Sequence, residues 1–192
     1  MQTGTRPGFV IGRVSWTLRA SCLFALLVVA GAAQAVSLED EAQAVLVYKT
    51  LRFVTWPELQ QAHQSFDLCV LGSDSVAVAF ETLRGRAFRK QLIDVFRLPE
   101  PAAQMRNCHL VFISPAALRL LRETLVTLQA RPVLTVGITP GFARSGGMIG
   151  VVSLNSRTVV EVNTAALRAA GIGLNSQLLQ LATIVRSDDE QK

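Results

Sequence analysis

The chain has 192 residues, half of them hydrophobic, and its 19 Lys and Arg outnumber its 14 Asp and Glu. Three of the basic residues and none of the acids precede residue 36, so residues 36–192 carry 16 basic against 14 acidic side chains. A balance near +2 excludes the strongly basic surface of a nucleic-acid-binding protein, and we predict no nucleic-acid partner. Residues 36–192 have the length of a single domain with a sizeable core.

The first 35 residues have the pattern of a cleaved secretory signal peptide. Three arginines come first, an aliphatic run at residues 23–29 follows, and Ala33-Gln34-Ala35 supplies small residues for cleavage. The aliphatic run is shorter than the roughly 20 residues that a membrane-spanning helix needs. We therefore predict export to the periplasm and no membrane span after cleavage, with a retained N-terminal anchor as the alternative.

The exported part is predicted to begin with a helix. Ser37 can cap it, acids occupy its first turn, and apolar residues then recur at helical spacing. Pro57 disfavours helical geometry in Trp56, so the helix should end near Thr55.

Four short apolar runs follow with the length and composition of strands; they are residues 66–71, 91–98, 108–114 and 133–137. Helical patterns lie between them, which favours a mostly parallel sheet. The run at 108–114 is apolar throughout and belongs in the middle of the sheet, whereas the alternating run at 91–98 is typical of an edge. In a doubly wound sheet the four runs would take the order 2-1-3-4.

The C-terminal third departs from this alternation. Residues 148–154 and 158–163 are β-rich runs on either side of a turn, which predicts a β-hairpin. Two helices, at about 164–170 and 176–185, and a flexible tail at 187–192 complete the chain. The predicted fold is a single α/β domain: a three-layer, Rossmann-like sandwich whose mostly parallel central sheet carries a C-terminal β-hairpin and helices on both faces.

Two cysteines remain after residue 35, Cys69 and Cys108. They lie on strands that the 2-1-3-4 order makes neighbours, and exported proteins normally hold paired thiols as disulfides. We therefore predict a structural disulfide, worth roughly 4 kcal/mol for a closed loop of about 40 residues. A redox-active pair is the alternative, although the Cys-x-x-Cys spacing of thioredoxin-like sites is absent.

The sequence contains no recognisable catalytic or metal-binding pattern. His63 and His109 are the only histidines and are not part of a zinc-ligand motif, and no serine stands in a Gly-x-Ser-x-Gly elbow. The glycine-rich segment at 137–147 lacks the order of a nucleotide-binding loop, so we assign its glycines to turns. These observations predict a protein that is not an enzyme and holds no cofactor or metal.

Taken together, these features resemble the YfiR-like family of periplasmic regulatory proteins. The resemblance rests on an ordered set of short segments spread over nearly all of residues 36–192. The segments are Tyr48, Phe53 and Trp56-Pro57, residues 66–72, 108–114 and 132–136, Gly141-Phe142, Gly146-Gly147-Met148-Ile149, Val162-Asn163, and residues 178–182.

The resemblance implies a homodimeric exported protein that binds the periplasmic sensor domain of an inner-membrane diguanylate cyclase. By repressing that enzyme, it would lower cyclic di-GMP and biofilm formation. The resemblance also implies that Cys69 and Cys108 are the family's cysteine pair. Some members carry a second pair around the Gly-Gly turn, and this chain has no cysteine at residues 143–150.

Four residues are candidate contacts for a partner or a ligand; they are Trp56, Phe142, Arg144 and Glu161. Arg144 lies on the glycine-rich segment and could meet an anionic group. For Trp56 the alternative is an aromatic side chain packed between helix and sheet. For Glu161, which interrupts a β-rich run, the alternative is a solvated outer face of the hairpin.

A periplasmic small-ligand-binding accessory protein is the alternative function. Its cleft would lie at the carboxyl ends of the parallel strands, where Ser114 and residues 138–141 would meet. An enzyme would require a convergent polar cluster in the same cleft.

Overall fold

The computed structural model describes residues 4, 36–57, 65–129, 131–154 and 157–187. Apart from Gly4, the predicted signal peptide lies outside the described residues, as do His63 and residues 188–192 of the predicted tail. In the described ranges no helix has the length and apolar character needed to cross a membrane.

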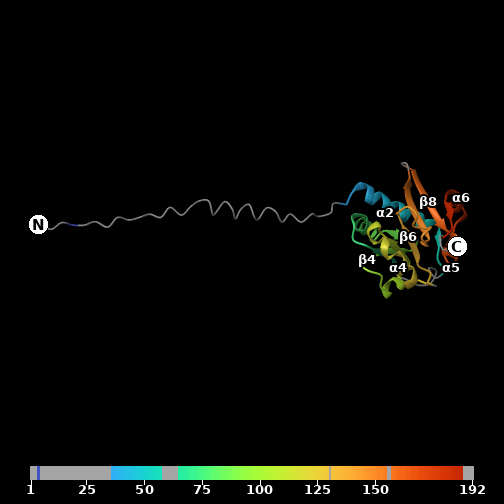
Figure 1. Cartoon of the computed structure of the whole chain (residues 1–192), viewed down its shortest axis with the longest axis horizontal. Helices are drawn as coiled ribbons and strands as arrows, with labels where there is room; N and C mark the ends of the chain where they lie inside the picture. The colour runs from blue at the N-terminus through green and yellow to red at the C-terminus, as the bar shows by residue number, and fades with distance from the viewer. Residues whose placement is uncertain (1–3, 5–35, 58–64, 130, 155–156, 188–192) are drawn as a thin grey trace. The chain divides into compact units, whose positions relative to one another are not determined.

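A sheet of eight strands forms the centre of the domain (Figure 1). Its order is β10-β8-β7-β6-β5-β2-β4-β3, and the pairings from β4 through β2, β5 and β6 to β7 are all parallel. The strands are β2 (Ser65–Leu71), β3 (Ala87–Phe88), β4 (Gln91–Leu98), β5 (Leu110–Ile113), β6 (Leu134–Gly137), β7 (Ile149–Leu154), β8 (Arg157–Asn163) and β10 (Thr183–Val185). The predicted 2-1-3-4 order and the mostly parallel sheet are confirmed.

The sheet separates two apolar cores. Along β2, Phe66 and Leu68 point into one core, while Cys69 and Leu71 point into the other, as the alternation of side chains in a strand requires. The first core also contains residues of α2 (Leu38–Thr50), α3 (Ser75–Ala79), η2 (Phe80–Leu83) and α5 (Thr164–Ala169). The second contains residues of η3 (Ala103–Asn107), η4 (Pro115–Leu120) and α4 (Leu121–Thr127). All four residues of β5 are buried, in agreement with its predicted central position.

Helix α2 begins with a capping box. The Asp40 N–H donates to Ser37 Oγ and the Ser37 N–H donates to the Asp40 carboxylate, at 3.1 and 3.2 Å. Slight burial acts to raise the pKa of Asp40, but hydrogen bonds from Ser37 and from the Ser75 hydroxyl outweigh it and hold that pKa below its ordinary value. The bond to Ser75 also ties the start of α2 to α3.

The predicted end of the first helix, near Thr55, is wrong. Helix α2 stops at Thr50, a 3₁₀ turn η1 (Leu51–Phe53) follows, and β1 (Val54–Thr55) pairs with β9 (Gly173–Leu174). The partner strand lies more than a hundred residues away in sequence, so a local pattern could not reveal it.

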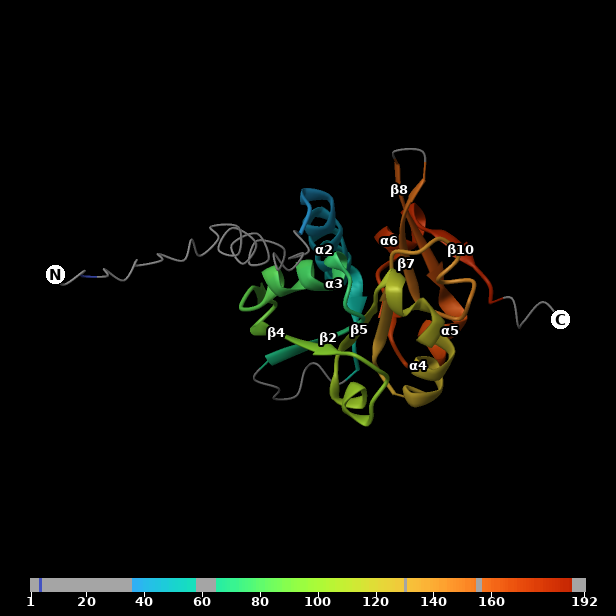
Figure 2. The ribbon, with the colours of Figure 1, turned by 60° about the vertical axis from the view of Figure 1, so that its left-hand side comes forward.

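The C-terminal hairpin is confirmed, since β7 and β8 pair antiparallel and lie side by side in Figure 2. The last predicted helix is wrong in its second half. Helix α6 spans Ser176–Leu181, and the chain then forms β10, which runs parallel to β8. Leu181, at the end of α6, is 83% exposed, while Val185 is buried as a strand residue. Strand β4, predicted at the edge, has only the two-residue β3 beyond it.

Candidate functional site

Trp56 lies in the apolar core rather than on the surface. Its side chain is 2% exposed, and its indole Nε1–H donates to the His109 carbonyl oxygen at 2.9 Å. The ring meets Phe66 and Phe88 edge-on, with centroids 5.4 and 6.2 Å apart. Trp56 therefore anchors the segment after α2 to the sheet. This matches the alternative given for Trp56, an aromatic side chain packed in the core, and the side chain is not accessible to a partner.

Phe142 is also buried, at 1% exposure, and fills a slot between two glycines. A Cβ at Gly137 or at Gly147 would overlap the Phe142 ring. Gly141 and Gly146 take φ values of 78° and 98°, as turns require. The glycine-rich segment is thus built around one aromatic ring, and its glycines leave room for that ring or allow the turns.

Glu161 is 9% exposed, so the predicted solvated outer face is wrong. It pairs in register with Gly150 on β7, and a Cβ at Gly150 would lie 3.5 Å from Glu161 Oε2. That oxygen has no hydrogen-bond partner among the described residues. A buried carboxylate oxygen without a donor is costly, so Glu161 is a candidate acceptor for an N–H group of a ligand or partner.

Asn163 holds this region together. Its Nδ2 donates to the Ala143 carbonyl oxygen at 3.1 Å and to Ser187 Oγ at 2.7 Å, while its Oδ1 accepts from the Ala166 N–H. Asn163 was not among the predicted contacts. The signal that could have identified it is an amide at the end of a β-rich run that also stands where a helix begins.

Three of the four predicted contacts therefore lie around the glycine-rich segment, and one lies elsewhere. Phe142 and Arg144 belong to the segment, and Glu161 lies next to Gly150 just beyond it. Trp56 belongs to the core on the opposite face of the sheet from Phe142. Of the four side chains, that of Arg144 is exposed.

Cys69 on β2 and Cys108 just before β5 form a disulfide with a Cα–Cα distance of 6.0 Å. Both cysteines are buried, at 2% and 6% exposure. Next to the bridge, the His109 N–H donates to the Asp67 carbonyl oxygen and the Asp67 N–H donates to His109 Nδ1, at 2.8 and 2.9 Å. The bridge and this pair of bonds fix the start of β5 against β2.

The Ser114 side of the crevice predicted for a small ligand is filled by the chain itself. Ser114 is fully buried, and a Cβ at Gly72 would overlap its hydroxyl. Beside it, the Asp74 carboxylate accepts from the N–H groups of Ala77 and Ala116, both at 3.0 Å, and so caps α3 and joins it to η4. The ends of β2 and β5 are thus packed closely together at Ser114.

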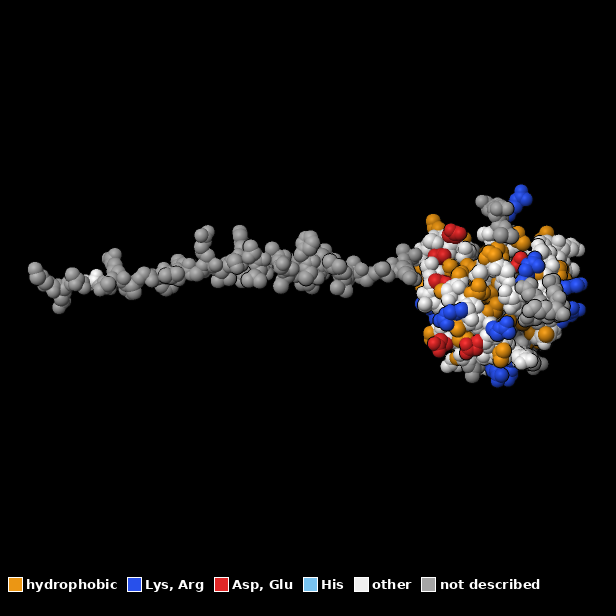
Figure 3. All heavy atoms as spheres, in the orientation of Figure 1, with side chains coloured by type: hydrophobic (Ala, Val, Ile, Leu, Met, Phe, Trp, Pro, Cys, Tyr) orange, Lys and Arg blue, Asp and Glu red, His pale blue; other side chains and the backbone are white. Residues whose placement is uncertain are grey.

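Depressions occur elsewhere on the described part of the chain. A groove of about 670 Å³ lies beside the disulfide, and one of about 410 Å³ lies between α4 and the glycine-rich segment. On the face seen in Figure 3, basic, acidic and apolar side chains are intermixed, and neither sign of charge forms a continuous field. The described part of the chain has no group of three or more His, Cys, Asp or Glu side chains placed to hold a metal ion.

A model of the YfiR/HmsC-like family matches residues 40–183. The chain belongs to this family. Its members are periplasmic regulators rather than enzymes. The match covers the sheet as far as the start of β10, both cores and the glycine-rich segment.

One solved structure supports the fold. A conserved domain protein from Vibrio cholerae superposes with a TM-score of 0.53 at 11% identity, over 76% of this chain and 59% of that one. The ABC domain from Streptococcus pneumonia in complex with L-Trp gives a TM-score of 0.46 at 11% identity, over 76% and 60%. This chain therefore spans about three fifths of the length of either structure. No curated protein matches the sequence.

Proposed function

We propose that this protein is a periplasmic repressor, possessing no catalytic activity, that binds the sensor domain of an inner-membrane diguanylate cyclase. Membership of the YfiR/HmsC-like family carries the proposal. Two buried polar groups agree with it, because Asn163 and Thr135 are engaged in holding loops and a helix end. The proposal includes cleavage after Ala35 and assembly as a homodimer.

Repression requires no covalent step. If the cyclase exchanges between active and inactive conformations, a protein that binds the inactive one more tightly shifts the population towards it. Holding 99% of a half-active enzyme in the inactive state takes about a 100-fold difference in affinity for the two conformations. The repressor therefore needs a rigid surface that recognises one arrangement of the sensor domain.

Co-purification and a cellular measurement test this proposal. The chain without residues 1–35 should bind the purified periplasmic domain of a membrane diguanylate cyclase from the same cell, beginning with any cyclase encoded beside it. Deletion of the gene should raise cellular cyclic di-GMP. Absence of binding to each of these cyclases, together with unchanged cyclic di-GMP, would refute the proposal. Sedimentation of the purified chain checks the homodimer.

Glu161 favours a second candidate, a small-ligand binder. Its buried Oε2 has no donor among the described residues, so a ligand with an ammonium or amide N–H group would satisfy it. The position differs from the strand-end crevice at Ser114, which is filled. Native mass spectrometry of the periplasmic protein should then show a bound metabolite that the Glu161→Gln variant loses, and a bare chain in both would count against this candidate.

A further inference from the structure

The two edges of the eight-stranded sheet differ in their protection. One edge is β3, and the other is β10, which has β8 on one side and, among the described residues, no strand on the other. An open edge presents unpaired N–H and C=O groups, and natural proteins protect such edges with charged side chains, proline or covering loops. The protection of each edge decides whether a further strand can join the sheet there.

Strand β3 has this protection. Arg86 precedes its two residues, and Arg89 and Lys90 follow them; all three are exposed. The Ala87 carbonyl oxygen already accepts from the Tyr48 hydroxyl at 2.8 Å. A further strand could pair here only by taking these charges out of water, so the sheet ends at β3.

Strand β10 lacks this protection. Residues 169–185 run from the last residue of α5 through β9 and α6 to the end of β10, and they contain no charged residue and no proline. This is the longest uncharged stretch within residues 39–192, although residues 36–192 hold 16 basic and 14 acidic side chains. Depletion of charge on a surface is the compositional mark of the centre of a protein interface.

Two large apolar side chains are exposed on this stretch. Leu181, the last residue of α6, is 83% exposed, and Ile184, in the middle of β10, is 49% exposed. Ile184 pairs in register with Val162, whose side chain is buried in the first core, so Ile184 lies on the same face of the sheet. A strand placed beyond β10 would therefore cover Ile184 and continue the first core outwards.

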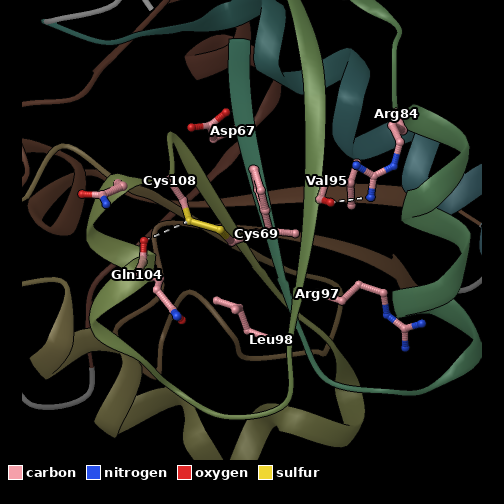
Figure 4. A pocket seen from close by; sticks show the side chains of 10 residues that line it. Asp67, Cys69, Arg84, Val95, Arg97, Leu98, Gln104 and Cys108 are labelled. Carbon is pink, nitrogen blue, oxygen red and sulfur yellow. Dashed lines mark hydrogen bonds between the residues drawn. A yellow bond between two sulfur atoms is a disulfide. The ribbon is translucent and has the colours of Figure 1, made fainter.

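Strand β4 also carries an exposed apolar side chain, Leu92, at 58%, but hydrogen bonds occupy the outer side of this strand. The Ile93 N–H donates to the Arg86 carbonyl oxygen at 2.9 Å. The Arg84 guanidinium donates to the Val95 carbonyl oxygen, beside the groove of about 670 Å³ that runs along β4 (Figure 4). Leu92 is therefore a matched exposed position on a strand that is not open to pairing.

We propose that a second copy of this chain covers the β10 edge. The two β10 strands lie antiparallel about a two-fold axis at Ile184 and join the two sheets into one. Such a pair is self-complementary, because Thr183 of each copy meets Val185 of the other. The uncharged stretch brings no like charges together, and the two Ile184 side chains pack about 5 Å apart. The inference rests on the homodimer in the proposed function and names its interface.

The protected β3 edge limits the assembly to two copies. If β10 paired with β3 of another copy, free edges would remain at both ends and the chain of copies would grow into a fibre. The charges beside β3 oppose that pairing, whereas two β10 edges that pair with each other leave no β10 edge exposed. A second copy also offers an edge that is open, uncharged and apolar at Ile184, which are the properties that the first copy requires.

Sedimentation equilibrium of the chain without residues 1–35 measures the dimer. Ile184→Lys sets two like charges opposite each other at the axis and should raise the dimer dissociation constant about tenfold or more. Leu92→Lys makes the same change at an exposed strand position outside the edge and should alter that constant less than about twofold. A mixture of Ile184→Lys and Ile184→Glu chains should dimerise again, because opposite charges then meet at the axis.

Leu181→Ser guards against a folding defect in the Ile184 variants. Its side chain is almost fully exposed, so the change leaves the fold of the single chain intact, and it should weaken the dimer about threefold or more. The far-ultraviolet circular dichroism of each variant should match that of the wild type. If Ile184→Lys does not fold, the dissociation constant of Leu181→Ser decides in its place.

The outcomes separate this interface from the rest of the proposed function. A monomeric wild type would refute the homodimer and the interface together, while the repressor would still be judged by binding to the sensor domain. A dimeric wild type with an Ile184→Lys variant that dimerises as well as Leu92→Lys would refute the interface alone. Growth of the wild type beyond a dimer at higher concentration would overturn the closed pair. Loss of sensor-domain binding by Ile184→Lys with the dimer intact would assign the edge to the sensor domain instead.

Discussion

Reduction of the Cys69–Cys108 disulfide should destabilise the domain by about 4 kcal/mol. The bridge joins residues 39 apart in sequence. In the chain-entropy model, opening a closed loop of that length returns about 13 cal/mol/K of entropy to the unfolded chain, or about 4 kcal/mol at 25 °C. For a domain of this size the loss corresponds to a fall in melting temperature of about 8–16 °C.

Urea unfolding of the chain without residues 1–35 measures this effect. Oxidised protein, protein reduced with dithiothreitol and the Cys69→Ala/Cys108→Ala variant should be compared, with the free energy extrapolated to zero urea. The double variant should be insensitive to dithiothreitol. It should also be less stable than reduced wild type, because both sulfurs are buried in the second core.

A difference of less than about 1 kcal/mol between oxidised and reduced protein would contradict the loop argument. That result would mean that the unfolded chain already keeps β2 and the start of β5 close together. If reduction changes the slope of the unfolding free energy against urea concentration, the effect of the disulfide lies in the unfolded state.

Three further substitutions test individual contacts. Gly147→Ala should lower the free energy of unfolding in urea by about 2–3 kcal/mol, because the added methyl group meets the Phe142 ring. Phe142→Ala should then cost less stability in the Gly147→Ala protein than in the wild type. Equal costs in the two proteins would argue against the overlap. Trp56→Phe should cost about 1–2 kcal/mol, since the His109 carbonyl loses the indole donor, and an unchanged melting temperature would make that bond negligible. Asp74→Ala should lower the stability measured by thermal unfolding by about 2 kcal/mol, because Asp74 caps α3 and joins it to η4. Asp74→Asn should lower stability by less, because Asn keeps one capping acceptor. Equal losses of stability in the two variants would mean that the charge of Asp74 matters more than the capping bond.

The sheet order could be predicted because its information is local. Strands β2 and β5 are apolar runs followed by helical patterns, and parallel pairing then fixes a small set of orders. The pairing of Val54–Thr55 with Gly173–Leu174 could not be predicted, because two residues carry no periodicity. For the same reason the run ending at Val185 was assigned to a helix, although its partner Asn163 makes it a strand.

The candidate contacts show a similar limit. A sequence shows that Trp56 and Phe142 are aromatic, but their burial depends on partners such as the His109 carbonyl and the glycines beside the Phe142 ring. The groove along β4 was not predicted at all. Its signal was the shortness of the segment between β4 and β5.

The segment between β4 and β5 contains the short turn η3 and leaves the groove open beside the disulfide. A crossover helix would bury Leu92 and Phe96 at about 25 cal/mol per Å² of apolar surface, and η3 does not reach them. The disulfide stabilises the same part of the sheet without covering the strand. Reduction should therefore loosen this side of the domain first. Hydrogen exchange of reduced protein should show amides of β2 and β4 losing protection before those of β7 and β8, and a uniform loss would mean that the bridge stabilises the whole sheet equally.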